Sequence, residues 1–261
     1  ISPSKLDSQT KPSGKVLSVG DGVASVDGLS DVGMGELVTI DGHIPALALN
    51  LNQTDTGCVI LGNPLDVKEG QLVSSTNQLL SVPVGDKFLG RVVNVLGQPI
   101  DGHGDIPSQQ YNPLEKIAPG VITRQSVDTP LQTGIKAIDA VIPIGRGQRE
   151  LIIGDRTTGK TAIGLTTIIN QKDQDVICVY VAIGQKRAQV SQNVAILQQH
   201  DALKNTIVVA ATASDPAAQQ FIAPYSGTAI AEYFLDQGKD VLVIYDDLTK
   251  HAWAYREVSL C

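Results

Sequence analysis

The sequence predicts an α/β protein in which a small N-terminal β-barrel precedes a domain built on a mainly parallel sheet. Before residue 86, short segments rich in Val and Ile are separated by glycine turns. Beyond about residue 150, apolar runs alternate with helical patterns, which is typical of strand–helix–strand units. We therefore divide the chain into a loose segment at 1–13, a barrel domain at 14–86 and an α/β domain at 87–261.

The barrel is predicted from short strands and the turns between them. Turn signals include Gly20-Asp21-Gly22 and Asp41-Gly42. Many short strands at close spacing favour a small closed barrel over a helical domain. The predicted strands are 15–19, 22–26, 36–40 and 56–61.

The α/β domain is predicted from nearly continuous apolar runs, which suit parallel strands buried on both faces. Between them, Val190, Val194 and Leu197 share one helical face, as do Leu165 and Ile169. Right-handed crossovers through such helices would place the strands in one sheet. The predicted strands are 150–153, 176–183, 206–211 and 240–245.

Composition excludes several classes of function. With 42% hydrophobic and 18% charged residues, the 261-residue chain has the composition of a folded protein. A net charge of -7 argues against broad affinity for nucleic acid, which relies on clustered Lys and Arg. The three cysteines, Cys58, Cys178 and Cys261, are too few and too far apart for a disulfide framework. No apolar run reaches the roughly 18 residues that span a bilayer.

The strongest chemical signal is a glycine-rich loop between the strand predicted at 150–153 and a helix. Glycines let main-chain N–H groups converge on phosphate oxygens, and a helix N-terminus favours negative charge. Lys160 would reach the β and γ phosphates, and the Thr161 hydroxyl would ligate Mg²⁺. A plain turn with an exposed lysine is the competing interpretation. The loop matches GxxxxGK[ST] and comprises Gly154, Asp155, Arg156, Thr157, Thr158, Gly159, Lys160 and Thr161, with Ala162 following as a further expected nucleotide contact.

A carboxylate to hold the water shell of Mg²⁺ is expected at the end of the last predicted strand. Asp246 follows the apolar run 241–245. Alone, such an Asp is usually a turn residue or helix cap, but the upstream loop in the same sheet favours a metal role through water. Asp247 is predicted to be a helix cap.

With these residues in view, the chain resembles the alpha subunits of the F-type ATP synthase over about residues 14–260. The family's glycine-rich loop and several ordered phrases recur. The phrases are 19–22, 97–102, 143–151, 180–186 and 245–248. We give the segments 98–102 and 145–147 no chemistry, because Pro and Gly turns explain them equally well.

The resemblance implies an N-terminal six-stranded barrel, a RecA-like nucleotide-binding domain and a C-terminal helical domain, of which the first two are expected here. It implies ATP or ADP with Mg²⁺ as ligands, at a site regarded as noncatalytic. Implied partners are beta subunits, which alternate with alpha in a hexameric ring, and the gamma shaft and delta subunits. Membrane association would come only through the proton-channel sector. It would lie at the cytoplasmic face of the bacterial plasma membrane, or at the mitochondrial inner or thylakoid membrane.

Our expectation about catalysis depends on Gln185. At the similar place, beta subunits have a glutamate that orients the attacking water, and a glutamine has no basic site at neutral pH. We therefore expect nucleotide binding without appreciable hydrolysis. Arg156 is similar to the arginine of the alpha phrase GDRxTGKT and would support phosphate or a neighbouring carboxylate, although a surface arginine often does nothing specific. Thr157 departs from the usual glutamine, so one side-chain contact is in doubt.

The chain stops where the family continues, so we expect an incomplete sheet with an unpaired edge, and aggregation without partners. Two other functions stay open at this point. One is an autonomous RecA-like ring ATPase or RNA translocase, which Gln185 and the lack of basic surface oppose. The other is a nonenzymatic fragment or assembly module.

Overall fold

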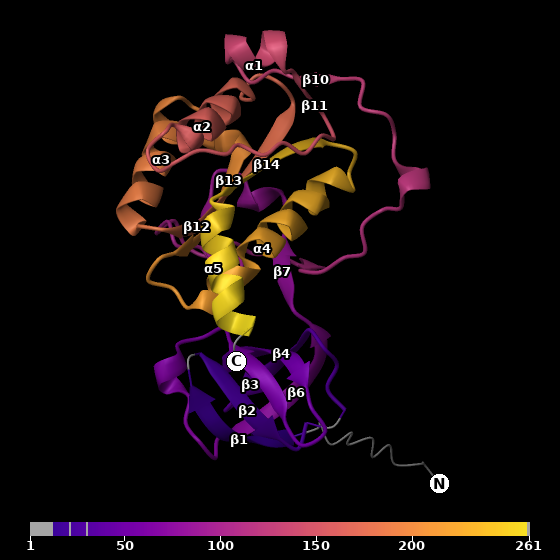
Figure 1. Ribbon diagram of the computed structural model, residues 1–261, viewed down its shortest axis with the longest axis vertical. Coiled ribbons are helices and arrows are strands. Elements are labelled where there is room, and N and C mark those ends of the chain that lie inside the picture. The colour runs from indigo at the N-terminus through magenta and orange to yellow at the C-terminus, as the bar shows by residue number, and fades with distance from the viewer. Residues whose placement is uncertain (1–12, 21, 30, 260–261) are drawn as a thin grey trace. The chain divides into compact units, whose positions relative to one another are not determined.

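The computed structural model describes residues 13–20, 22–29 and 31–259, which form two compact units (Figure 1). The first unit holds the chain up to Leu80, with residues 216–218 and those from 254 on, and the second holds the remainder. The loose segment predicted at 1–13 lies outside the described residues except for Ser13, which begins a strand. The domain boundary at residue 86 stays a prediction.

The first unit contains a closed six-stranded barrel, which confirms the predicted N-terminal fold. Each strand pairs antiparallel with both neighbours, in the order β1-β2-β5-β4-β3-β6. The sequence pattern missed β4 and β6. The strands are β1 (Ser13–Gly20), β2 (Val23–Asp27), β3 (Glu36–Ile40), β4 (Ile44–Leu51), β5 (Thr56–Ile60) and β6 (Leu72–Leu79), and one 3-10 turn, η1 (Pro64–Asp66), follows β5.

The barrel interior is filled by alternate residues in strands such as β2 and β3. Ala24 and Val26 of β2, and Val38 and Ile40 of β3, are all fully buried. Cys58 of β5 belongs to the same core, and burial raises the pKa of its thiol to about 12. The thiol is therefore a core hydrophobe rather than a nucleophile.

The second unit contains a four-stranded parallel sheet in the order β14-β12-β13-β8. Three of its strands follow the sequence prediction. The strands are β8 (Val92–Val93), β12 (Val176–Gln185), β13 (Thr206–Thr212) and β14 (Asp240–Asp246), and the helices within this unit are α1 (Lys136–Val141), α2 (Lys160–Asn170) and α3 (Arg187–Gln199). The division between the units cuts α4 (Ala217–Leu235) after Ala218 and α5 (Leu248–Ser259) before Ala254. Two small ladders pair β7 (Ser81–Val84) with β9 (Gln110–Pro113) and β10 (Pro130–Leu131) with β11 (Ile144–Gly145), and the 3-10 turns are η2 (Asp86–Phe88), η3 (Val121–Thr123) and η4 (Leu203–Asn205).

The core of this sheet lies around its two central strands. Every residue of β13 and all of β12 except Gln185 are buried, so both faces of these strands are covered. Helices α2 and α3 contribute Leu165 and Ile168, and Val190 and Leu197, to that core. The predicted helical faces therefore pack as expected.

The strand predicted at 150–153 is wrong. Residues 150–155 have no regular secondary structure, and Leu151 and Ile153 are 67% and 85% exposed. A strand needs a neighbour to hydrogen-bond with, and among the described residues β14 pairs only with β12. The apolar run therefore has the composition of a buried strand but does not pair with the open edge of β14.

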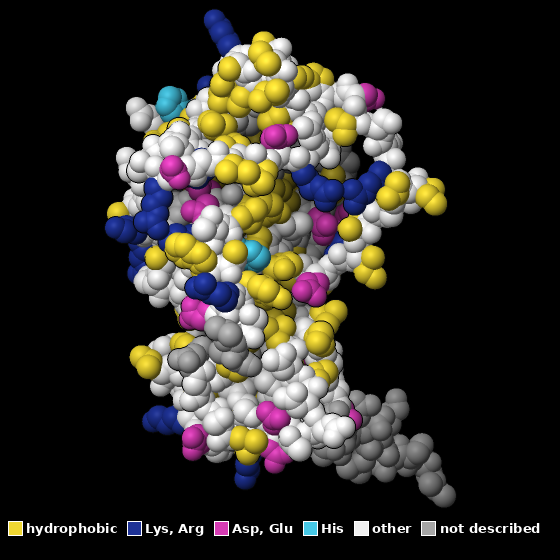
Figure 2. Space-filling view, in the orientation of Figure 1, with side chains coloured by type: hydrophobic (Ala, Val, Ile, Leu, Met, Phe, Trp, Pro, Cys, Tyr) yellow, Lys and Arg dark blue, Asp and Glu magenta, His cyan; other side chains and the backbone are white. Residues whose placement is uncertain are grey.

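Apolar surface is also displayed by the connection from β9 to β10. It bows away from the sheet around η3, and Figures 1 and 2 show it at the right of the view. Ile117, Val121 and Ile122 on it are at least 88% exposed. Across the described residues, none of the helices combines the length and apolar character required to span a bilayer.

Candidate functional site

The glycine-rich loop at 154–161 folds around the ammonium of Lys160. Lys160 Nζ donates to the carbonyl oxygens of Gly154 and Asp155, at 2.6 Å and 2.5 Å. The Thr158 hydroxyl donates to the same Asp155 oxygen at 2.8 Å. The chain reverses through Gly159, whose φ of 97° favours glycine. The ammonium group of Lys160 is thereby held by two main-chain carbonyl oxygens of the loop.

Helix α2 begins at Lys160, directly after the loop, and its N-terminus has no side-chain cap. The N–H groups of a first helical turn lack partners inside the helix and carry partial positive charge. Ile163 N, the first to bond within the chain, donates to Gly159 O at 3.0 Å. An uncapped N-terminus beside a lysine fits an anionic group such as phosphate.

Thr161 and Asp246 meet although 85 residues separate them, with Thr161 Oγ1 donating to Asp246 Oδ2 at 2.7 Å. Gly164 explains the approach, because a Cβ there would lie only 3.2 Å from Ile244 of β14. Asp246 ends β14 and is 8% exposed. The structure therefore brings Thr161 and Asp246 together at the start of α2, where Lys160 is the preceding residue. Their roles toward phosphate and Mg²⁺ stay predictions.

Gln185 joins this site from the carboxyl end of β12. Gly184, with a φ of 63°, turns the chain so that Gln185 Nε2 donates to the main-chain oxygen of Asp246 at 3.0 Å. The same nitrogen lies 3.4 Å from the Tyr180 phenol. Gln185 Oε1 is buried without a hydrogen-bond partner, which leaves one acceptor for a bound group.

Tyr180 is a site residue that the sequence pattern missed. It lies in the middle of β12 with no exposed surface, and its OH donates to Asp246 Oδ2 at 2.8 Å. Burial raises the pKa of this phenol above its usual range, and the Asp246 carboxylate adds to the effect. In the sequence, Tyr180 is only an aromatic residue in an apolar run, which is the usual sign of packing.

Three other residues were assigned from sequence. Asp247 caps α5 as predicted, because its Oδ1 accepts from Lys250 N at 2.9 Å. The peptide bond that precedes it, between Asp246 and Asp247, is cis. Arg156 is exposed, and its side chain contacts no acidic group among the described residues. Thr157 has a positive φ of 62°, which is unusual for a β-branched residue.

The oxygen groups at the site suit magnesium better than a softer metal. A threonine hydroxyl and an aspartate carboxylate are hard ligands, and Mg²⁺ takes one or two such groups with phosphates and water. Among the described residues there is no cluster of three or more His, Cys, Asp or Glu that could hold a metal alone. The residues therefore fit Mg²⁺ bound together with a phosphate ligand.

The chain has a barrel followed by a parallel-sheet unit, in which a glycine-rich loop contacts an aspartate at a strand end. This combination defines a P-loop nucleotide-binding protein. Comparison with family models identifies the particular family. Residues 9–77 match the beta-barrel domain of the ATP synthase alpha/beta family, and residues 134–261 match its nucleotide-binding domain. The chain belongs to the ATP synthase alpha/beta family.

Curated relatives carry alpha-subunit names. The chain is 57% identical over 260 residues to ATP synthase subunit alpha 2 of Photobacterium profundum, covering 100% of this chain and 51% of that protein. It is 57% identical over 252 residues to ATP synthase subunit alpha 1 of Nitrosospira multiformis, covering 97% and 49%. With ATP synthase subunit alpha of Vesicomyosocius okutanii it shares 58% identity over 252 residues, again covering 97% and 49%. The chain spans about half the length of the curated relatives it matches.

Proposed function

We propose that this chain is the nucleotide-binding alpha subunit of an F-type proton-translocating ATP synthase, and that it holds ATP or ADP with Mg²⁺ without appreciable hydrolysis. The meeting of Lys160, Thr161 and Asp246 at one uncapped helix N-terminus carries the proposal. The alpha-subunit names of the relatives support it.

In this proposal each group at the site has one task. Main-chain N–H groups of residues 154–162 bind the phosphates, and Lys160 supplies a compact positive charge to them. Thr161 would present its hydroxyl oxygen to the metal while its O–H group still donates to Asp246 Oδ2. Asp246 holds metal-bound water. Bound Mg²⁺ would offset the negative charge of the phosphates.

Gln185 is the reason to expect binding without turnover. Its nitrogen is committed to Asp246 O, and its free Oε1 belongs to a neutral amide. That oxygen can orient a water molecule near the γ phosphate but cannot take its proton at neutral pH. A catalytic base is therefore missing from the position where general-base catalysis would need one.

The proposed assembly is a ring in which this chain alternates with beta subunits around the gamma shaft, with delta as a further partner. Attachment to the membrane would run through the proton-channel sector. It would lie at the cytoplasmic face of the bacterial plasma membrane, or at the mitochondrial inner or thylakoid membrane. Co-purification with beta-type subunits tests this assembly, and a chain that never associates with them would contradict it.

Mg-ATP affinity tests the site itself. Lys160→Ala should weaken Mg-ATP binding by about 1.5 to 3 kcal/mol, because a charge-assisted contact is lost. Lys204→Ala is the matched control, since Lys204 lies in an exposed pair with Asp201. Equal affinities in the two variants would contradict the assigned site.

A steady-state assay separates the noncatalytic subunit from an autonomous ATPase. We expect no turnover from the chain without beta-type subunits, whereas an enzyme of ordinary rate would show several turnovers per second, on the order of the usual median. RNA-stimulated hydrolysis would favour the translocase instead. The net charge of -7 opposes that outcome.

A further inference from the structure

A chain of polar groups runs from the candidate site into α3, where it ends at the exposed Gln189. Tyr180 lies at its centre, with its OH donating to Asp246 Oδ2 at 2.8 Å. On the other side, Asn193 Nδ2 donates to the Tyr180 oxygen at 2.9 Å, and Gln189 Nε2 donates to Asn193 Oδ1 at 3.0 Å. Tyr180, Asn193 and Asp246 are 0%, 1% and 8% exposed. Groups this deeply buried are costly to leave without partners.

The donors around the phenol fix the direction in which its hydrogen points. Asn193 and Gln185 both approach the Tyr180 oxygen with amide N–H groups, so it accepts from both. A phenol has one hydrogen, and the remaining neighbour, Asp246 Oδ2, can only accept when ionised. The Tyr180 hydroxyl on β12 therefore points its hydrogen at the Asp246 carboxylate.

The carboxylate is held on one oxygen. Asp246 Oδ2 accepts from both Tyr180 and Thr161, whereas no donor in the described part of the chain reaches Oδ1. The Tyr180 bond is the more rigid of the two, because β12 is a fully buried central strand and the phenol has no freedom to turn away. Thr161, in contrast, sits in the first turn of α2, where the proposed metal would bind.

We propose that Tyr180 is a positioning residue for the metal-binding carboxylate. It anchors Asp246 Oδ2 so that the carboxylate keeps its orientation when Thr161 turns its oxygen to Mg²⁺. The inference rests on the proposed function, because it needs Mg²⁺ with a nucleotide at this loop. Residues that orient a metal-binding group commonly change metal affinity about tenfold when they are altered.

Tyr180→Phe tests the role, because it removes the hydroxyl and keeps the ring. ATP affinity is measured on the full chain in its purified assembly, once with Mg²⁺ and once with EDTA, together with the melting temperature. We expect affinity in EDTA to stay within about twofold and affinity in Mg²⁺ to fall about tenfold. Mn²⁺ replaces Mg²⁺ in a parallel paramagnetic resonance measurement, where the spectrum of the bound ion should change.

Tyr245→Phe is the matched control. Tyr245 precedes Asp246 on β14, but its OH bonds to the Thr228 hydroxyl at 2.6 Å rather than to the carboxylate. In this variant, the ratio of the ATP affinity in Mg²⁺ to the ATP affinity in EDTA should stay within about twofold of the parent value. A fall in that ratio as large as in Tyr180→Phe would overturn the inference, since loss of any phenol would then suffice.

Other outcomes keep the two proposals apart. A Tyr180→Phe variant that loses affinity equally with Mg²⁺ and with EDTA, or that loses none, would show a purely structural role. A parent chain that binds no ATP in either condition refutes the proposed function instead. If Tyr180→Phe does not fold, Asn193→Ser replaces it, and its ratio should fall about threefold because the phenol then loses the closer of its two amide donors.

Discussion

The barrel and the parallel sheet solve the same problem, the pairing of main-chain groups, in different ways. The barrel closes on itself, so each of its six strands has two neighbours. The sheet of the second unit runs from β14 to β8, and both end strands have one neighbour among the described residues. Strands β12 and β13 are buried throughout, whereas β14 is mostly half-buried.

The difference teaches where chemistry can be built. An antiparallel barrel sends successive strand ends to opposite rims, whereas a parallel sheet collects every carboxyl end at one edge. Gln185 and Asp246 meet because β12 and β14 both end there. The open side of β14 and the exposed run 151–153 belong to this same unit, so our expectation of aggregation without partners concerns this unit rather than the barrel.

The largest expected effect contrasts a barrel isoleucine with one beside the loop. Ile40→Ala should lower the free energy of unfolding by about 3 to 4 kcal/mol, because Ile40 has no exposed surface and the change leaves a cavity. Ile153→Ala should cost less than about 0.5 kcal/mol, since Ile153 is 85% exposed. Hydrogen exchange followed by mass spectrometry reads the two units separately. Similar losses in both variants would break the comparison.

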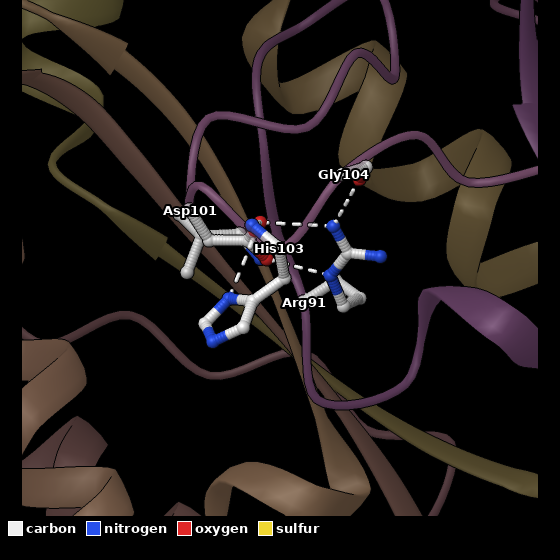
Figure 3. A network of polar contacts seen from close by, with 5 residues as sticks. Arg91, Asp101, His103 and Gly104 are labelled. Atoms are coloured by element: carbon white, nitrogen blue, oxygen red, sulfur yellow. Dashed lines mark hydrogen bonds and ion pairs between the residues drawn. The ribbon is translucent and has the colours of Figure 1, made fainter.

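A smaller effect contrasts two hydrogen-bonded carboxylates, one from each unit. Glu36 is a buried residue, and Asp101 is a half-buried residue whose side chain is 7% exposed. Asp101 accepts from Arg91 Nε and Nη2 at 2.7 Å and 2.9 Å, and Figure 3 shows the pair with its further bond to Gly104. Glu36 is held by neutral donors instead, among them the hydroxyl of Ser75. Asp101→Asn should lower the free energy of unfolding by about 3 kcal/mol, because Arg91 loses its charged partner. Glu36→Gln should lower it by about 1 to 2 kcal/mol.

Acid titration of the unfolding free energy checks the same pair. Hydrogen bonds from Arg91 hold the pKa of Asp101 below its ordinary value. Burial raises the pKa of Glu36, but hydrogen bonds from Ser75 and two main-chain groups outweigh it and lower the pKa overall. Both groups therefore stabilise the fold above about pH 4 to 5, and this contribution is lost as pH falls through the folded pKa.

The control for both measurements is an exposed ion pair. Lys204 and Asp201 lie 2.7 Å apart, with side chains 53% and 71% exposed. Asp201→Asn should cost less than about 1 kcal/mol, as exposed pairs usually do. The acid dependence should weaken in Asp101→Asn and Glu36→Gln, and unchanged dependence in both would contradict the assigned pKa directions.

The sequence predicts the loop, the strand-end aspartate and half of the strands because each depends on neighbours in the chain. The barrel strands show period-2 burial, and Lys160 and Thr161 follow a fixed spacing from Gly154. The strand at 150–153 fails because pairing is a property of the sheet, which composition does not encode. Tyr180 was missed for a related reason, since its hydroxyl finds Asp246 across the sheet, 66 positions away.

The smallest expected effect concerns left-handed backbone in the two units. Among the described residues of the barrel, the non-glycine residues with positive φ are Asp41 and Asn77, which tolerate that conformation. In the glycine-rich loop, the non-glycine residue with positive φ is Thr157, with a φ of 62°. Thr157→Asn should therefore raise the free energy of unfolding by about 0.5 to 1 kcal/mol, measured by urea unfolding.

Thr157→Val is the control for this strain, because valine keeps the branched Cβ and should give no gain. Both variants remove the Thr157 hydroxyl, which donates to Arg156 O at 2.6 Å, so the contrast isolates the backbone. An equal gain from valine would mean that the hydroxyl, rather than the branch, sets the stability. A loss with asparagine would mean that the loop is not strained, and that the barrel and the loop differ only in composition at these positions.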